Sequence, residues 1–230
     1  MMPARPDPAV IALILANLIP VFGVLYLDWD VGSIVVLYWS ENLIVGGYTI
    51  LKMLVTGGKG TPFLILFFCM HYGGFCAIHG MFVLELTHFA GGSGIGLPTA
   101  TWPGPLYFIQ LFINLVLRIL RAAPAEYLWA CLALVLSHGV SFALNFIGRR
   151  EYARVTLRQL MNAPYKRIVV MHIAIIAGGF LVISIGSPLG LLLALVALKT
   201  GMDIMLHDRS HRESVKPATA PASRNASKGE

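Results

Sequence analysis

The chain alternates between long apolar runs and short polar connections. Each run has about twenty residues, the length of an α-helix that crosses roughly 30 Å of hydrocarbon. The runs lie at residues 9–27, 34–55, 62–88, 125–147, 168–186 and 188–207. Unpaired backbone groups are too costly in lipid, so such runs predict helices. We therefore expect an all-α, polytopic transmembrane bundle with six spans.

A seventh apolar run, residues 106–120, has a different pattern. Gln110, Asn114 and Arg118 recur at every fourth position and so line one side of a helix. One polar stripe on an apolar helix indicates an interfacial or re-entrant amphipathic helix. A seventh span is the alternative.

The charged residues indicate a direction for the spans, because Lys and Arg stay on the cytoplasmic side. Acidic residues and basic residues mark alternate connections, starting from Arg5 before the first run. The largest basic group separates the runs at 125–147 and 168–186: Arg149, Arg150, Arg154, Arg158, Lys166 and Arg167. This alternation favours six spans, although Arg118 and Arg121 would then lie outside, so seven spans stay open.

This orientation of the spans predicts a multi-pass protein of the cell inner (plasma) membrane with both termini in the cytoplasm. Residues 1–8 form a short leader, residues 9–208 the helical bundle, and residues 209–230 a disordered tail rich in Ser, Ala, Pro and charge.

The composition indicates which classes of partner suit this chain. The 230 residues are 57% hydrophobic and 12% charged, whereas a soluble domain has about 25% charged residues. The net charge of +6 comes from basic residues that flank the apolar runs. It therefore fits lipid headgroups and not nucleic acid. The cysteines, Cys69, Cys76 and Cys131, fall within apolar runs and imply no disulfide framework.

Ionisable residues inside membrane spans are rare, and each suggests a function or a pairing. Here the set is Glu41, His71, His79, Glu85, His138, His172, Lys199, Asp203 and His207. Neutral imidazoles and a carboxylate drawn from several helices are suitable ligands for zinc or iron. The predicted metal ligands are His71, His172, Asp203 and His207, with His79 and His138 as second candidates. Interhelical hydrogen bonds without any ion are the alternative.

Depth along the spans divides these residues into two groups. His71 and His79 are eight residues apart, about 12 Å of rise and about 80° of rotation, so one ion cannot easily bind both. We expect His71 to group with His172 and Asp203 on the cytoplasmic side. His79 is expected deeper, with Glu41 and His138. Glu41 is the candidate catalytic residue, because a carboxylate at mid-membrane needs a cation, a metal or a proton.

Small residues on the third run, Gly73, Ala77 and Gly80, form one helix face. Such a face permits close approach of a neighbouring span.

Several short motifs recur together in this sequence. They are Tyr38-Trp39-Ser40-Glu41-Asn42; His71-Tyr72-Gly73-Gly74-Phe75 with His79-Gly80; Ser137-His138 with Ser141-Phe142 and Asn145-Phe146; Pro164-Tyr165-Lys166-Arg167-Ile168 with His172; and Lys199, Asp203 and His207. On these motifs the chain resembles a family of polytopic bacterial membrane proteins that carries only a domain-of-unknown-function label. The resemblance implies no activity.

The sequence leaves several function classes open. The first is a metal-dependent membrane enzyme that acts on a lipid-like or small-molecule substrate. The second is a proton- or ion-coupled transporter, which predicts an internal repeat that the sequence does not contain. A haem protein with histidine ligands from two spans and a structural membrane protein are further alternatives.

Overall fold

The regular structure of the described residues is entirely helical. The computed structural model describes residues 8–89, 102–104 and 106–215, without the side chains of residues 8–13, 16, 203 and 205–215. The helices are α1 (Pro8–Tyr26), α2 (Val31–Thr56), α3 (Thr61–Thr87), α4 (Leu106–Ala122), α5 (Ala125–Ser141), α6 (Leu157–Asn162), α7 (Tyr165–Ile185) and α8 (Leu189–Val215). A π-helical turn, η1 (Phe142–Gly148), extends α5, and a 3₁₀ turn, η2 (Glu151–Ala153), follows it.

Four helical segments are long and apolar enough to cross a membrane: α2, α3, α5 with η1 (Ala125–Gly148), and α6 with α7 (Leu157–Ile185). Apolar side chains cover their outer surfaces. Trp129 is 69% exposed and Leu144 is 64% exposed on α5 and η1, which suits lipid better than water. The prediction of a helical membrane bundle is supported in this form. In the other two predicted spans, the fully described apolar parts are Asn17–Tyr26 of α1 and Leu189–Met202 of α8.

The main core lies around α2. Val35, Val36 and Trp39 are almost fully buried there, and they pack with residues from α3, α7 and α8. Close contact between α2 and α3 requires Gly80, because a Cβ at this position would lie 2.5 Å from the Trp39 ring. Ala77 is also buried, whereas a Cβ at Gly73 would meet nothing within 4 Å. The predicted small-residue face therefore packs closely at Gly80 and Ala77 but not at Gly73.

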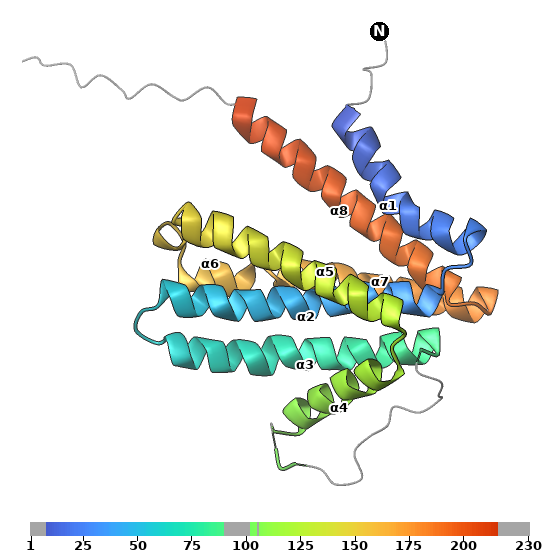
Figure 1. The fold of residues 1–230 in the computed structure, drawn as a ribbon, viewed down its shortest axis with the longest axis horizontal. Coiled ribbons are helices and arrows are strands. Elements are labelled where there is room, and N and C mark those ends of the chain that lie inside the picture. Colours follow the sequence, from blue (N-terminus) through green and yellow to red (C-terminus); the bar gives the residue numbers. More distant parts are fainter. Residues whose placement is uncertain (1–7, 90–101, 105, 216–230) are drawn as a thin grey trace, which may run out of the picture.

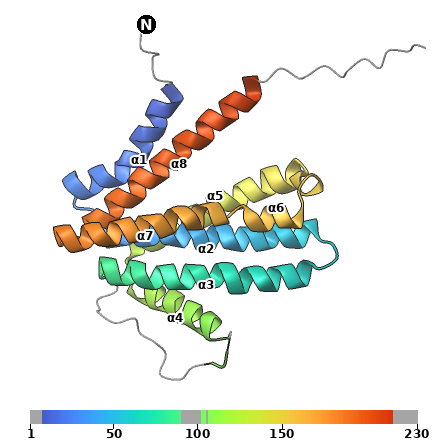
Figure 2. The same cartoon turned by 180° about the vertical axis from the view of Figure 1, so that it is seen from behind.

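The helices form a bundle with one divergent pair. α2, α3, α5 and α7 lie side by side, and α1 pairs with α8, which leaves the bundle at an angle (Figures 1 and 2). α8 starts close to α7, where Gly178 faces Leu191. A tight turn joins α7 to α8, with Gly186 in the left-handed region at φ 69°.

The amphipathic run at 106–120 forms α4, which packs along α3. Its buried side chains are Leu111, Leu115 and Ile119, at every fourth position. The end of α3, the end of α4 and the start of α5 lie at the same end of the bundle (Figure 1). α4 therefore connects α3 to α5 without running the length of the bundle.

Except at the C-terminal end of α8, the helix boundaries agree with the predicted runs within a few residues. Asp30 caps α2, since its side chain accepts a hydrogen bond of 2.6 Å from the Ser33 N–H. A capping box of Thr156 and Gln159 starts α6, ahead of the apolar run. α8 continues to Val215, beyond Arg209, where the sequence predicted the tail to begin.

Candidate functional site

A charged pair joins α2 to α7 inside the bundle. Glu41 Oε2 lies 2.7 Å from Arg167 Nη2, and the two side chains are 15% and 32% exposed. Glu41 is ten residues into α2, about 15 Å along the helix axis. A carboxylate at this depth is costly unless a cation neutralises it, and Arg167 does so with a charge-assisted hydrogen bond.

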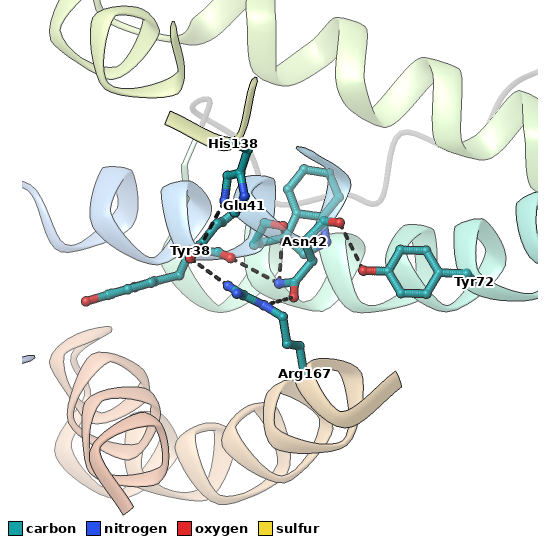
Figure 3. A network of polar contacts seen from close by, with 7 residues as sticks. Tyr38, Glu41, Asn42, Tyr72, His138 and Arg167 are labelled. Atoms are coloured by element: carbon teal, nitrogen blue, oxygen red, sulfur yellow. Dashed lines mark hydrogen bonds and ion pairs between the residues drawn. The ribbon is translucent and has the colours of Figure 1, made fainter. Parts of the chain in front are cut away.

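A third helix reaches the same carboxylate. His138 Nε2 on α5 lies 3.7 Å from Glu41 Oε1, and the two side chains point toward one another in Figure 3. α5 is fixed near this point by Tyr48, whose hydroxyl donates to the Val135 carbonyl at 2.8 Å. Glu41 therefore lies between a permanent cation and a titratable imidazole.

Asn42 holds Arg167 in place. Its Oδ1 accepts a hydrogen bond of 3.4 Å from Arg167 Nε, while its Nδ2 donates to the Tyr38 carbonyl at 3.0 Å. The Asn42 carbonyl accepts a hydrogen bond of 2.9 Å from the Tyr72 hydroxyl of α3 (Figure 3). The guanidinium thus bonds two adjacent side chains of α2, which restricts its orientation.

A small cleft of about 80 Å³ opens beside this network. It lies between α2, α7 and α8, and its lining is Tyr38, Glu41, Asn42, Arg167, Val170, Met171, Leu195, Lys199 and Met202. The Lys199 ammonium is 4.7 Å from the centre of the Tyr38 ring, a cation–π distance. Of the described charged side chains, one carboxylate and two cations line the cleft, so these groups carry one excess positive charge.

The three other described histidines of the predicted set lie elsewhere. His71 Nδ1 is 2.8 Å from the Tyr165 hydroxyl at the start of α7. His79 Nδ1 is 2.7 Å from the Phe75 carbonyl, and His79 Nε2 is 2.9 Å from His172 Nδ1. The expected grouping of His79 with Glu41 and His138, apart from His172, is therefore wrong. His79 lies on the side of α3 that faces α7. Residue spacing along one helix does not show which neighbouring helix a side chain faces. The expected proximity of Glu41 and His138 is confirmed.

A family model described as a family of unknown function, DUF6498, matches residues 1–220. The chain belongs to this family. Membership in the DUF6498 family confirms the resemblance to a family with only a domain-of-unknown-function label. No curated protein matches the chain, and no solved structure does.

The metal prediction concerns side chains that the structure describes only in part. Within the described residues, no three His, Cys, Asp or Glu side chains lie close enough together to bind one metal ion. The side chains of Asp203 and His207 lie outside the described residues. His71 and His172 have separate partners, Tyr165 and His79.

Sequence reasoning did not assign Arg167 or Asn42 to the site. Arg167 was counted with the basic residues that indicate topology, and Asn42 appeared only within a motif. One signal was available: a membrane carboxylate needs a cation, and Arg167 is the basic residue nearest to the start of the apolar run at 168–186.

Proposed function

We propose that the protein is a membrane-embedded enzyme that acts on a lipid-like substrate with an anionic headgroup. The observation that carries this proposal is the charge of the α2–α7–α8 cleft, where Arg167 and Lys199 face one carboxylate, Glu41. In a low-dielectric site the second cation attracts an anion strongly. No described carboxylate lies within ion-pairing distance of Lys199.

In this proposal the residues of the cleft have separate roles. Lys199 and Arg167 bind the phosphate or carboxylate of the headgroup. Glu41 is the general base, because its Oε1 is shared with no cation and lies near His138. His138 then receives or returns the proton through the 3.7 Å contact.

The orientation proposed for this site follows the charge distribution. Lys52 lies in the last turns of α2, Lys59 in the α2–α3 connection and Arg149 just after η1, all at the bundle end where α2 finishes and α3 begins. Since cations favour the cytoplasm, this end is proposed to be cytoplasmic, in a six-span arrangement of the inner membrane with α4 re-entrant or interfacial. A reporter attached after Arg150 tests this proposal: cytoplasmic labelling is expected, and labelling from outside contradicts it.

Binding of a short-chain anionic lipid tests the cation site. Purified full-length protein is titrated with dioctanoyl phosphatidate and, separately, with dioctanoyl phosphatidylcholine. We expect phosphatidate to bind more tightly, and Lys199→Met to weaken it about tenfold, equivalent to about 1.4 kcal/mol.

Lys52→Met is the matched control. The Lys52 ammonium is 5.3 Å from the centre of the Phe146 ring, so this variant also loses a cation–π contact but lies outside the cleft. Equal loss of affinity in both lysine variants, or equal binding of both lipids, contradicts the anion site.

Turnover is tested with the protein reconstituted in a total lipid extract. Mass spectrometry is expected to show loss of an anionic lipid species over time with the wild type and not with Glu41→Gln. If the wild type binds phosphatidate but consumes no anionic species, the enzyme proposal fails while the binding site stands.

A proton-coupled transporter is the second candidate. The observation that favours it is the chain Arg167–Glu41–His138, which links α7, α2 and α5 across the bundle. It predicts that proteoliposomes with an internal pH dye show proton flux that depends on an added anionic substrate. Glu41→Gln should abolish this flux.

The metal-dependent form of the enzyme stays a separate prediction. Purified wild-type protein would then contain stoichiometric zinc or iron, and His172→Ala and Asp203→Ala would each lose it. Wild-type protein without these metals, or variants that keep them, contradicts the predicted ligands.

A further inference from the structure

A large apolar groove lies between α3 and α7. It shares no lining residue with the charged cleft. Its volume is about 410 Å³. The lining residues are Phe75, Ile78, His79, Phe82, Leu86, His172, Ile175, Ile176, Gly179, Phe180 and Ile183. The two histidines are the only lining side chains that can form strong hydrogen bonds. The groove therefore combines a long apolar wall with one small polar point.

The hydrogen bonds define the tautomers of these histidines. The Phe75 carbonyl only accepts, so His79 Nδ1 must carry the proton of their 2.7 Å hydrogen bond. In a neutral His79 ring, Nε2 is then an acceptor. His172 Nδ1, at 2.9 Å, must donate to it. A neutral His172 consequently has its free lone pair on Nε2.

His79 is most stable as a neutral imidazole here. His79 is 4% exposed, and no carboxylate lines the groove. An unpaired imidazolium in such an apolar place is more costly to bury than a neutral ring. His172 is exposed, and no described group forms a hydrogen bond with its Nε2. One hydrogen-bond acceptor therefore faces a membrane groove that contains no described donor for it.

The length of the groove indicates the size of a ligand. On α3 it extends from Phe75 to Leu86, eleven residues or about 16 Å of helix rise. This is about half of the roughly 30 Å hydrocarbon thickness, the space of one lipid leaflet. No cation lines the groove, which disfavours a second anionic headgroup.

We infer that the α3–α7 groove binds a long-chain alcohol, such as an isoprenoid or other lipid alcohol, whose hydroxyl donates a hydrogen bond to His172 Nε2. The apolar side chains of α3 and α7 cover the hydrocarbon chain. The Phe75 carbonyl and His79 hold His172 in the acceptor tautomer, as carboxylates and carbonyls orient histidines in other sites. This site is separate from the α2–α7–α8 cleft and does not depend on its proposed function.

A photoreactive, clickable geranylgeraniol analogue and its methyl ether test the inference in nanodiscs that contain the full-length protein. The ether has the same chain but cannot donate a hydrogen bond. We expect the alcohol to label peptides of α3 and α7, and the ether to label them about fivefold less, as for a lost hydrogen bond in an apolar site. Equal labelling by both probes, or labelling confined to other helices, overturns the inference.

Variants separate the acceptor from general packing. His172→Leu should reduce labelling by the alcohol to the level of the ether. His71→Leu, on α3 and outside the groove, should leave it unchanged. Gly179→Leu places a side chain in the groove from a position where a Cβ is only in ordinary contact, 3.8 Å from Leu86. It should reduce labelling by both probes. Wild-type labelling in folded His172→Leu or folded Gly179→Leu protein overturns the site.

Discussion

Two polar regions lie on different faces of α7 and use opposite chemistry. On the face toward α2 and α8, Arg167 is paired with a carboxylate at 2.7 Å. On the face toward α3, His172 joins His79 at 2.9 Å. The two residues of α7 are five positions apart, which is about 140° around the helix. One helix therefore supports a charged site and a hydrogen-bonded histidine site that are about 7.5 Å apart along its axis.

The difference shows two ways to keep polar groups inside a membrane bundle. The charged site depends on complementary charges, so removal of either partner leaves an unpaired charge inside the bundle. The histidine site depends on two successive hydrogen bonds, from His79 to the Phe75 carbonyl and from His172 to His79. It can lose one member and leave only an unsatisfied imidazole nitrogen. The charged region should therefore be far more sensitive to substitution.

The largest effect is expected for Arg167→Met. This variant leaves the Glu41 carboxylate without its cation and should lower the free energy of unfolding by about 3 kcal/mol. The double variant Glu41→Gln/Arg167→Met should recover most of this loss. Reversible unfolding in mixed micelles measures it, with the exposed Arg158→Met as control. A double variant as unstable as the single one would show that the pair is not the cause.

A smaller effect is expected at the contact of α7 with α8. In Gly178→Ala the new Cβ would lie 2.8 Å from Leu191 Cα, so the helices must separate at a cost of about 1–3 kcal/mol. The adjacent Gly179→Ala has room on the α3 face and should be neutral or stabilising by up to about 1 kcal/mol. The same unfolding measurement compares the two. Equal effects would mean that the two faces of α7 are packed alike.

The histidine pair should respond weakly. His79→Leu removes the acceptor of the His172 Nδ1 proton and should cost about 1 kcal/mol in unfolding free energy. The loss of unfolding free energy in His79→Leu, divided by the loss in Arg167→Met, measures the contrast between the two sites. A loss as large as that of Arg167→Met would contradict a neutral His79 ring.

The smallest effect is expected for Tyr165→Phe. It removes the 2.8 Å hydrogen bond to His71, and such bonds between membrane helices contribute about 0.6 kcal/mol on average. The control is Tyr26→Phe, at a side chain that is 71% exposed. A double-mutant cycle with His71→Leu gives the coupling energy. No coupling would mean that this pair does not stabilise the bundle.

The helices were predictable because length and apolar character determine them directly. The run expected at 62–88 is the helix Thr61–Thr87, and the run with one polar stripe is the helix that buries Leu111, Leu115 and Ile119. The prediction was less successful for the C-terminal end of α8, where helical structure continues into a polar sequence.

The site was predictable only in part. Depth along the spans correctly brought Glu41 and His138 together, because both lie near the middle of their helices. It failed for His79, since the rotation of a helix against its neighbours decides which partner a side chain meets. Arg167 was missed because one residue can mark topology and also reach into the bundle on a long side chain.

The π-helical turn η1 determines how α5 attaches to the bundle. His138 and Phe146 are eight residues apart, so in a continuous α-helix they would point about 80° away from each other. The wider i→i+5 turn from Phe142 to Gly148 unwinds the helix between them and reduces this angle. His138 can then meet Glu41 while Phe146, 2% exposed, packs beside Met53 farther along α2. A helix that is otherwise mostly open to lipid thus gains two anchor points on one neighbour through a local change of pitch.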